Sequence, residues 1–177
     1  MSKDSAAVSL YETSNGQTLH YDVIDGTGHS EALKITSKAQ DITVYAKRLI
    51  GGREDCLDIN DECRNIRVCC DSWEPAGEYL ATLKGGSSGI TLEGTIARKA
   101  QTVEIDCGNW SDQSNDPTSA VTCLLTLAGG GAWRYRLLNY DGEFHGTAPK
   151  TCTLRLPPLI TKLWLFCMGI LKALHII

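Results

Sequence analysis

Short segments in which apolar and polar residues alternate recur along this chain at a constant spacing. A first set comprises residues 32–35, 56–59 and 80–83. A second set, with the same spacing, comprises residues 41–44, 65–68 and 89–92. Such alternation is typical of a strand with one buried and one solvated face, and short strands that return at a period of about 20–50 residues are typical of a solenoid. We therefore predict an all-β chain in which each coil contributes two strands.

The repeat continues in both directions with a slightly shorter step. Upstream, it aligns three pairs of apolar side chains: Leu10 with Leu33, Leu19 with Ile42, and Tyr21 with Val44. Downstream, it places residues 103–105 after residues 81–83. Residues 121–125 are predicted to form the second strand of that coil, and residues 133–137 and 152–156 a final coil. About five to six coils result, each of which buries its apolar face only against its neighbours.

The register of the repeat predicts which side chains stack inside the solenoid. Four inward ladders are expected: Leu33/Leu57/Ala81/Val103, Ile35/Ile59/Leu83/Ile105, Ile42/Ile66/Ile90 and Val44/Val68/Leu92. Aromatic residues make up only 7% of the chain, so this core is expected to be aliphatic. The 17 glycines suit a chain with many tight turns, and Gly51-Gly52 are expected to adopt positive φ at a corner between coils.

The period of the repeat, together with the absence of a leucine-rich consensus and of helical periodicity, indicates the class of solenoid. Leucine-rich repeats need a recurring Leu and Asn consensus, and helical repeats need longer units with helical periodicity; neither is present here. The period and the short turns at residues 39–41, 64–65 and 88–89 resemble the right-handed, pectin-lyase-like parallel β-helix family. The resemblance covers about residues 8–156 and implies a short, single-stranded right-handed parallel β-helix. The hydrolase pattern of that family (Asn-x-Asp, Asp-Asp, Gly-His, Arg-x-Lys in order) is not reproduced, so no activity is implied.

The composition and charge of the chain bear on what kind of molecule the protein binds and where it is made. The net charge of −4 and the scattering of Lys and Arg along the chain argue against nucleic acid as a main partner. Residues 1–5 are polar and lack the apolar stretch of a secretory signal peptide. We therefore expect a protein made in a reducing cytoplasm. The four histidines show no ligand spacing with one another or with the cysteines, so neither a metal nor a cofactor is expected.

The eight cysteines are expected to be mainly free thiols, with disulfides or metal binding as alternatives. Cys70 aligns with Ala46 and Gly94 on the inward side of its strand. Cys123 lies between Val121 and Leu125 in an alternating segment and has the same parity as both. Thiols at such positions behave as small hydrophobic side chains.

The pattern changes after Pro157-Pro158, which divides the chain into a β-helix domain (residues 1–157) and a C-terminal apolar segment (residues 158–177). The two prolines suit the start of a helix. This helix has three alternative roles: a membrane span, which needs about 20 apolar residues, a cap on the solenoid, or a contact with copies of the chain or another assembly component. We prefer the third, because the narrow polar stripe of the helix leaves a wide apolar surface. The expected interface comprises Leu163, Trp164, Phe166, Ile170, Leu171 and Leu174, extended by Trp133, Tyr135 and Tyr140.

Acidic side chains are the main candidates for catalysis. They are Glu54, Asp55, Asp58, Asp61, Glu62, Glu104, Asp106 and Asp112. Asp58 and Glu104 share an outward ladder position but are separated by a coil, which is about 9–10 Å at an inter-strand spacing of ~4.8 Å. Inverting glycosidases need a carboxyl separation of about 6.5–9.5 Å. We interpret these residues as a solvated acidic face and expect no catalytic residue among them.

A break in the repeat, at residues 108–118, is the best candidate for a recognition loop. Insertions in solenoids usually form loops on one binding face. Trp110 can stack on a sugar or on a ring of a partner, while Asn109, Asp112 and Gln113 supply hydrogen bonds. In the alternative interpretation, Trp110 packs on the flank of the solenoid.

These features favour a non-enzymatic structural protein of a homo-oligomeric assembly, with a trimer as the expected symmetry and other assembly components as further partners. A spike, fibre or decoration protein of a phage or virus particle is the most concrete version, by analogy at the level of the fold. The alternative is a module that binds or cleaves polysaccharide. A third hypothesis is a cytoskeleton-like β-helix that polymerises end to end, which predicts uncapped coils.

Overall fold

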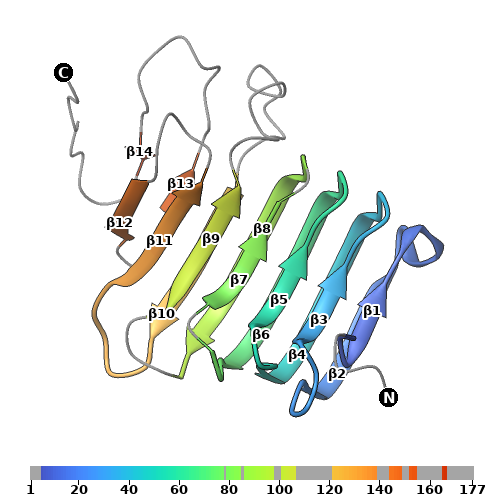
Figure 1. The fold of residues 1–177 in the computed structure, drawn as a ribbon, viewed down its shortest axis with the longest axis horizontal. Helices are drawn as coiled ribbons and strands as arrows, with labels where there is room; N and C mark the ends of the chain where they lie inside the picture. The colour runs from blue at the N-terminus through green and yellow to red at the C-terminus, as the bar shows by residue number, and fades with distance from the viewer. Residues whose placement is uncertain are drawn as a thin grey trace, which may run out of the picture.

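Two sheets face each other across the core, and the chain passes from one to the other once in every half coil (Figure 1). The computed structural model describes residues 5–77, 79–84, 86–97, 101–106, 121–138, 144–148, 152–154 and 165–166. The first sheet has the order β1 (Val8–Leu10), β3 (Glu31–Ile35), β5 (Asp55–Ile59), β7 (Tyr79–Leu83), β9 (Thr102–Asp106), β11 (Trp133–Leu138), β12 (Phe144–Ala148). The second has the order β14 (Leu165–Phe166), β13 (Cys152–Leu154), β10 (Val121–Leu127), β8 (Ser88–Ile96), β6 (Arg64–Glu74), β4 (Gln40–Ile50), β2 (Thr18–Asp25).

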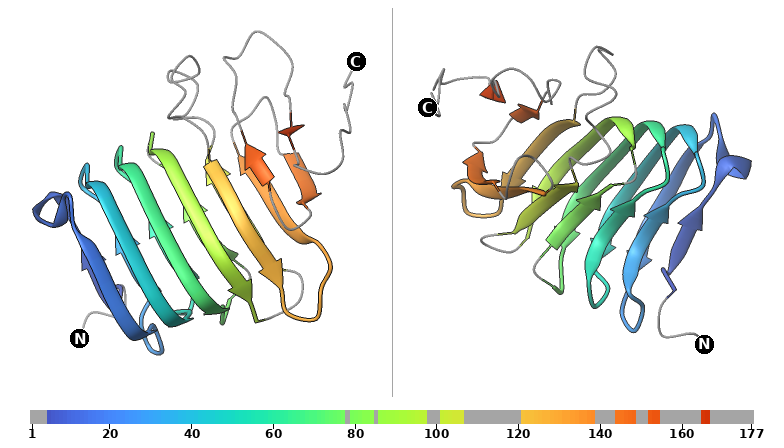
Figure 2. Two further views of the ribbon diagram at one scale, coloured as in Figure 1. Left: turned by 180° about the vertical axis from the view of Figure 1, so that it is seen from behind. Right: turned by 45° about the horizontal axis from the view of Figure 1, so that its top comes forward.

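The strands from β1 to β9 wind as a parallel β-solenoid of about four turns (Figure 2). β10 and β11 then continue both sheets by one more parallel strand each. The predicted parallel solenoid is therefore confirmed. A 3₁₀ turn, η1 (Glu12–Ser14), is the one helical element of the described residues, and none of their helices is long and apolar enough to cross a membrane.

The constant spacing seen in the sequence is the true register between coils two, three and four. Leu33 pairs with Leu57 and Leu57 with Ala81, while Ile42 pairs with Ile66 and Ile66 with Ile90. All four predicted ladders are aligned as expected, and every member is 0% exposed. The core of the solenoid thus consists of rows of aliphatic side chains that run from coil to coil.

A repeated left-handed residue shapes the corner at the start of β4, β6 and β8 in the second sheet. Asp41, Asn65 and Gly89 occupy the same place in three successive coils and have φ values of 56°, 52° and 65°. Asp, Asn and Gly are the residue types that adopt this conformation at the lowest cost. The Asn65 side chain also donates a hydrogen bond of 2.7 Å to the Asp41 carboxylate, which links two successive corners.

A second corner depends on close packing. Gly51 and Gly52 do not have positive φ, contrary to the prediction. A Cβ atom at Gly52 would lie 2.2 Å from the Ser30 carbonyl oxygen, and one at Gly51 would lie 2.8 Å from the Ala76 nitrogen. These glycines are needed because successive coils touch there, backbone against backbone.

The register of the first coil differs from the prediction by two positions. Leu10 pairs with Ile35 and not with Leu33, and Leu19 pairs with Val44 and not with Ile42. A slip of two positions keeps the same side chains on the inward face, and Leu10 is buried as expected. The turn between β2 and β3 accounts for the difference in length between this coil and the next, because it comprises residues 26–30 where the turn between β4 and β5 comprises residues 51–54.

The last predicted coil is wrong, because the chain reverses there. β11 pairs parallel with β9, but β12 pairs antiparallel with β11 and β13 antiparallel with β10. Trp133 and Tyr135 are 0% and 3% exposed in β11, so they belong to the core and not to an interface. Trp73 in β6 is also 0% exposed, and its indole donates a hydrogen bond to the Glu93 carbonyl. The core is therefore not purely aliphatic.

The predicted C-terminal helix lies largely outside the described residues. Within residues 158–177 the structure describes only β14, where Leu165–Phe166 pairs antiparallel with β13. Most of the expected interface therefore also lies outside the described residues: Leu163, Trp164, Ile170, Leu171 and Leu174, together with Tyr140.

Candidate functional site

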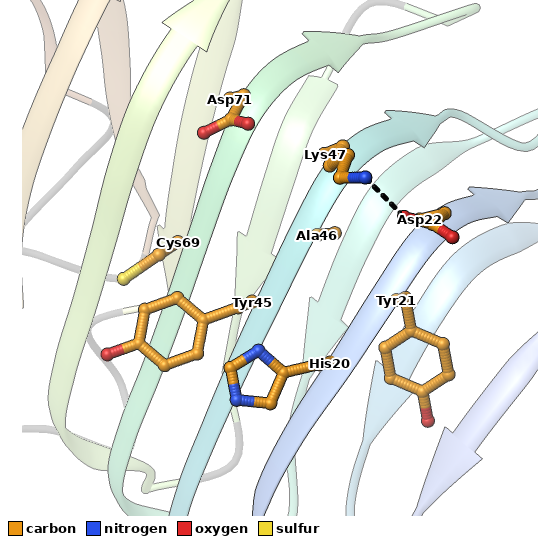
Figure 3. A pocket seen from close by; sticks show the side chains of 8 residues that line it. All are labelled: His20, Tyr21, Asp22, Tyr45, Ala46, Lys47, Cys69 and Asp71. Carbon is orange, nitrogen blue, oxygen red and sulfur yellow. Dashed lines mark ion pairs between the residues drawn. The ribbon is translucent and has the colours of Figure 1, made fainter.

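The outer face of the second sheet contains a shallow groove across the first three coils (Figure 3). Its volume is about 330 Å³. One row of outward side chains crosses it in register: His20 on β2, Tyr45 on β4 and Cys69 on β6. A second row, two positions further along the same strands, comprises Asp22, Lys47 and Asp71.

Two aromatic rings form the apolar part of the groove. The rings of His20 and Tyr45 are stacked, with centroids 5.0 Å apart and planes inclined by 14°. The Tyr45 side chain is 39% exposed and stands between His20 and Cys69 (Figure 3). An exposed ring that is already held in a stack is a preorganised surface for a flat ligand.

Charged groups form the polar rim. The Lys47 ammonium lies 2.6 Å from the Asp22 carboxylate. This hydrogen bond and the charge of Lys47 lower the pKa of Asp22, and the same contact raises the pKa of Lys47. The negative charge of Asp71 also raises the pKa of Lys47, so the lysine stands in the field of two carboxylates.

The Cys69 thiol is not poised for nucleophilic chemistry. Partial burial raises its pKa, so the thiol form prevails at neutral pH. Its sulfur lies 3.1 Å from Arg67 Nε and 3.4 Å from Glu93 Oε2, and Arg67 is itself paired with Glu93 at 2.7 Å. Cys69 thus places a small, uncharged side chain between the Tyr45 ring and the Arg67–Glu93 ion pair.

The acidic residues of the first sheet do not form the solvated face that was predicted. Asp55 and Asp58 are 7% and 2% exposed, and Glu31, which pairs in register with Asp55, is 7% exposed. Asp58 contacts the Lys34 ammonium at 3.0 Å and the Lys84 ammonium at 3.8 Å. These lysines, from the coils on either side, cover the carboxylates.

Burial changes the protonation of this cluster. It raises the pKa of Asp55 to about 7, with repulsion from Asp58 and Glu31 in the same direction, and a hydrogen bond from Thr82 and the charge of Lys84 opposing it. The Oδ1 atom of Asp58 accepts no hydrogen bond from the described residues. A polymeric substrate cannot reach carboxyl groups that are covered in this way.

The other acidic candidates are dispersed. Glu54, Asp61 and Glu62 are exposed on turns. Thr82 separates Asp58 from Glu104 in the outward row, as predicted from the sequence. Glu104 is paired with Arg136 at 3.1 Å. Asp112 lies outside the described residues.

The predicted recognition loop lies outside the described residues as well, with Asn109, Trp110, Asp112 and Gln113. The sequence did not reveal the groove, because the register predicted for the first coil aligns His20 with Thr43. In the structure, His20 pairs with Tyr45. Within the described part of the chain, no group of three or more His, Cys, Asp or Glu side chains gathers as a metal site.

Comparison of the chain with protein-family models, with curated proteins and with solved structures finds no match. The resemblance to pectin-lyase-like β-helices is therefore one of architecture, a parallel β-solenoid with two strands per coil in the described sheets.

Proposed function

We propose that this protein is a non-enzymatic building block of a homo-oligomeric assembly. A phage or virus particle is the setting that we propose, on the analogy with solenoid spikes and fibres. The observation that supports the proposal most directly is the first coil, whose inner side chains have no stacking partner on one side among the described residues.

Partial burial of the first coil is visible residue by residue. Val8, Leu19 and Tyr21 pack against the core but remain partly exposed. Their partners in the second coil, Leu33, Val44 and Ala46, are 0%, 0% and 5% exposed. Another coil or another chain placed on this end would complete three apolar ladders, and burial of such side chains stabilises association.

The backbone at this end is also available for pairing. β1 and β2 are the edge strands of their sheets, and no further strand of the described residues pairs with them. Natural proteins usually protect such edges, because unpaired N–H and C=O groups direct another strand onto them. The same end would therefore form both hydrogen bonds and apolar contacts with a second copy of the chain.

Light scattering of the full-length chain tests this function. We expect a defined oligomer, whose mass also tests the predicted trimer. Leu19→Asp should lower that mass to the monomer, because a charge at the end of an apolar ladder is desolvated in the contact. Thr18→Asp is the matched control, since Thr18 neighbours Leu19 on the same strand and is exposed. Far-UV circular dichroism should show that both variants keep their strands.

Two results would contradict the proposal. One is a wild-type chain that is monomeric at every concentration. The other is a Leu19→Asp variant that stays folded and keeps the wild-type mass. A combined Phe166→Asp and Leu171→Asp variant tests the C-terminal contact expected from the sequence. If only that variant dissociates, the protein remains a building block, but its contact is not the first coil.

A further inference from the structure

The stack of rings on the outer face of the second sheet stops abruptly. His20 and Tyr45 occupy the first two positions of their row, and the third position is occupied by Cys69. Neighbouring strands lie ~4.8 Å apart, so a third aromatic side chain at this position would continue the stack. Cys69 lines the same groove and is much smaller than a ring, so a slot without a third ring follows beside Tyr45, on the side away from His20.

The shape and chemistry of this slot specify an amphipathic ring. Its wall is the exposed Tyr45 ring, which favours a flat apolar face. Its rim comprises Asp71 and Lys47, two positions further along β6 and β4, and Lys47 is paired with Asp22. A carboxylate accepts hydrogen bonds from hydroxyl groups, and an ammonium donates them. A pyranose ring has both parts: a face of C–H groups and an edge of hydroxyl groups.

The charge of the groove selects among sugars. Among the residues that line the groove, Asp22 and Asp71 are opposed by Lys47; the Arg67 charge beside Cys69 is balanced by Glu93, and the whole chain has a net charge of −4. An acidic glycan would be repelled, while an organic cation would compete with Lys47, which already lies 2.6 Å from Asp22. An uncharged sugar meets neither penalty. Since the groove is shallow and its lining extends over three neighbouring strands on the outer face of the sheet, the sugar can be one unit of a longer chain.

We propose that the slot between Tyr45 and Cys69 is a binding site for a neutral pyranose unit of a glycan. Tyr45 stacks on the sugar ring, and the stack with His20 fixes the orientation of the Tyr45 ring. Lys47 and Asp71 bind the hydroxyl groups at the edge of the sugar. The groove begins on β2, the edge strand of the proposed assembly contact, and Tyr21 belongs to both, whereas Tyr45 and Cys69 lie on the second and third coils and can be changed without touching that contact.

Titration of the ¹⁵N-labelled full-length chain, followed by NMR, tests the site. The probes are maltohexaose and cellohexaose, with an oligogalacturonate of similar length as the acidic comparison. We expect at least one neutral hexasaccharide to shift the amide signals of Tyr45, Cys69 and Asp71. The oligogalacturonate should bind at least tenfold more weakly.

Two variants remove the site by opposite means. Tyr45→Ala deletes the wall, and Cys69→Tyr fills the slot with a side chain that continues the stack. Each should weaken the Kd at least tenfold. Tyr11→Ala is the matched control, because Tyr11 is 46% exposed and does not line the groove; its Kd should stay within twofold of the wild type. Thermal melts should show that the variants stay folded.

Four outcomes would overturn the proposal. The first is that neither neutral hexasaccharide shifts any signal, and the second is that the oligogalacturonate binds more tightly. The third is that a folded Tyr45→Ala or Cys69→Tyr variant keeps the wild-type Kd. The fourth is that Trp110→Ala abolishes the binding while Tyr45→Ala does not, which would place the sugar at the loop.

Discussion

Replacing Asp55 by Asn should stabilise the protein at neutral pH and change how its stability depends on pH. Asp55 is 7% exposed, lies in register with Glu31, and is repelled by Asp58. Three carboxylates in this cluster face two ammonium groups, those of Lys34 and Lys84. An uncharged Asn fits the same volume and removes the unbalanced charge.

The magnitude follows from the pKa. Burial raises the pKa of Asp55 from 3.8 to about 7. At ~1.36 kcal/mol per pKa unit, ionisation in the folded state costs on the order of 4 kcal/mol. The folded protein binds a proton at Asp55 between about pH 4 and pH 7, while the unfolded chain has released it. Stability is therefore lost as the pH rises through this interval, and the loss is complete above about pH 7.

Urea unfolding followed by far-UV circular dichroism, at pH 5 and at pH 8, measures the effect. The advantage of Asp55→Asn over the wild type should grow by about 2–3 kcal/mol from pH 5 to pH 8. Glu54→Gln is the matched control, because it removes an exposed carboxylate next to Asp55. It should shift both values by less than about 0.5 kcal/mol.

The reasoning would be refuted by either of two results. One is that the wild type and Asp55→Asn show the same pH dependence. The other is that Asp55→Asn is the less stable protein at pH 8, which would mean that the ionised carboxylate of Asp55 is a net stabilising partner of Lys84.

Three further predictions concern the core. Ile66→Asp should abolish cooperative unfolding, because an unpaired charge in an apolar ladder costs several kcal/mol; a folded variant with a sharp urea transition would contradict the register. Gly94→Ala should destabilise the protein by about 3 kcal/mol or more, because its Cβ would lie 1.7 Å from the Cys70 carbonyl oxygen. Gly16→Ala, where φ is also positive but the Cβ meets nothing within 4 Å, should cost only about 1–2 kcal/mol in the same urea assay. Thiol titration of the denatured, unreduced chain should count close to eight, while native Cys63 and Cys70, whose pKa values burial raises to about 11 and about 12, should react slowly; a count near zero would contradict the free-thiol prediction.

The register of the middle coils could be predicted because the spacing of the strands agrees with the spacing of the turns. Leu57 and Ile66 repeat at the same step as the left-handed corner at Asn65, so strand and turn both specify one register. The inward positions of Cys70 and Cys123 follow from the same parity, and both are buried.

The groove could not be predicted, because hydrophobic parity does not distinguish two registers that differ by two positions. Either register places Leu10 and Leu19 on the inward face. The partner of His20, however, changes from Thr43 to Tyr45. The turn between β2 and β3 (residues 26–30) decides between the two, because it differs in length from the turn between β4 and β5 (residues 51–54), and alternation in the strands does not reveal how many residues a turn takes up.

Local pattern is sufficient to specify three features of this protein: two strands per coil, the constant register of the middle coils, and the inward ladders. Tertiary structure alone decided the direction of the last strands, because alternation is the same in parallel and antiparallel pairs, and β12 and β13 run antiparallel. It also decided the burial of Asp55 and Asp58. The outward parity of Asp58 predicts solvation, and Asp55 was expected on the same solvated face, but side chains from neighbouring coils cover both, and a linear pattern does not contain those contacts.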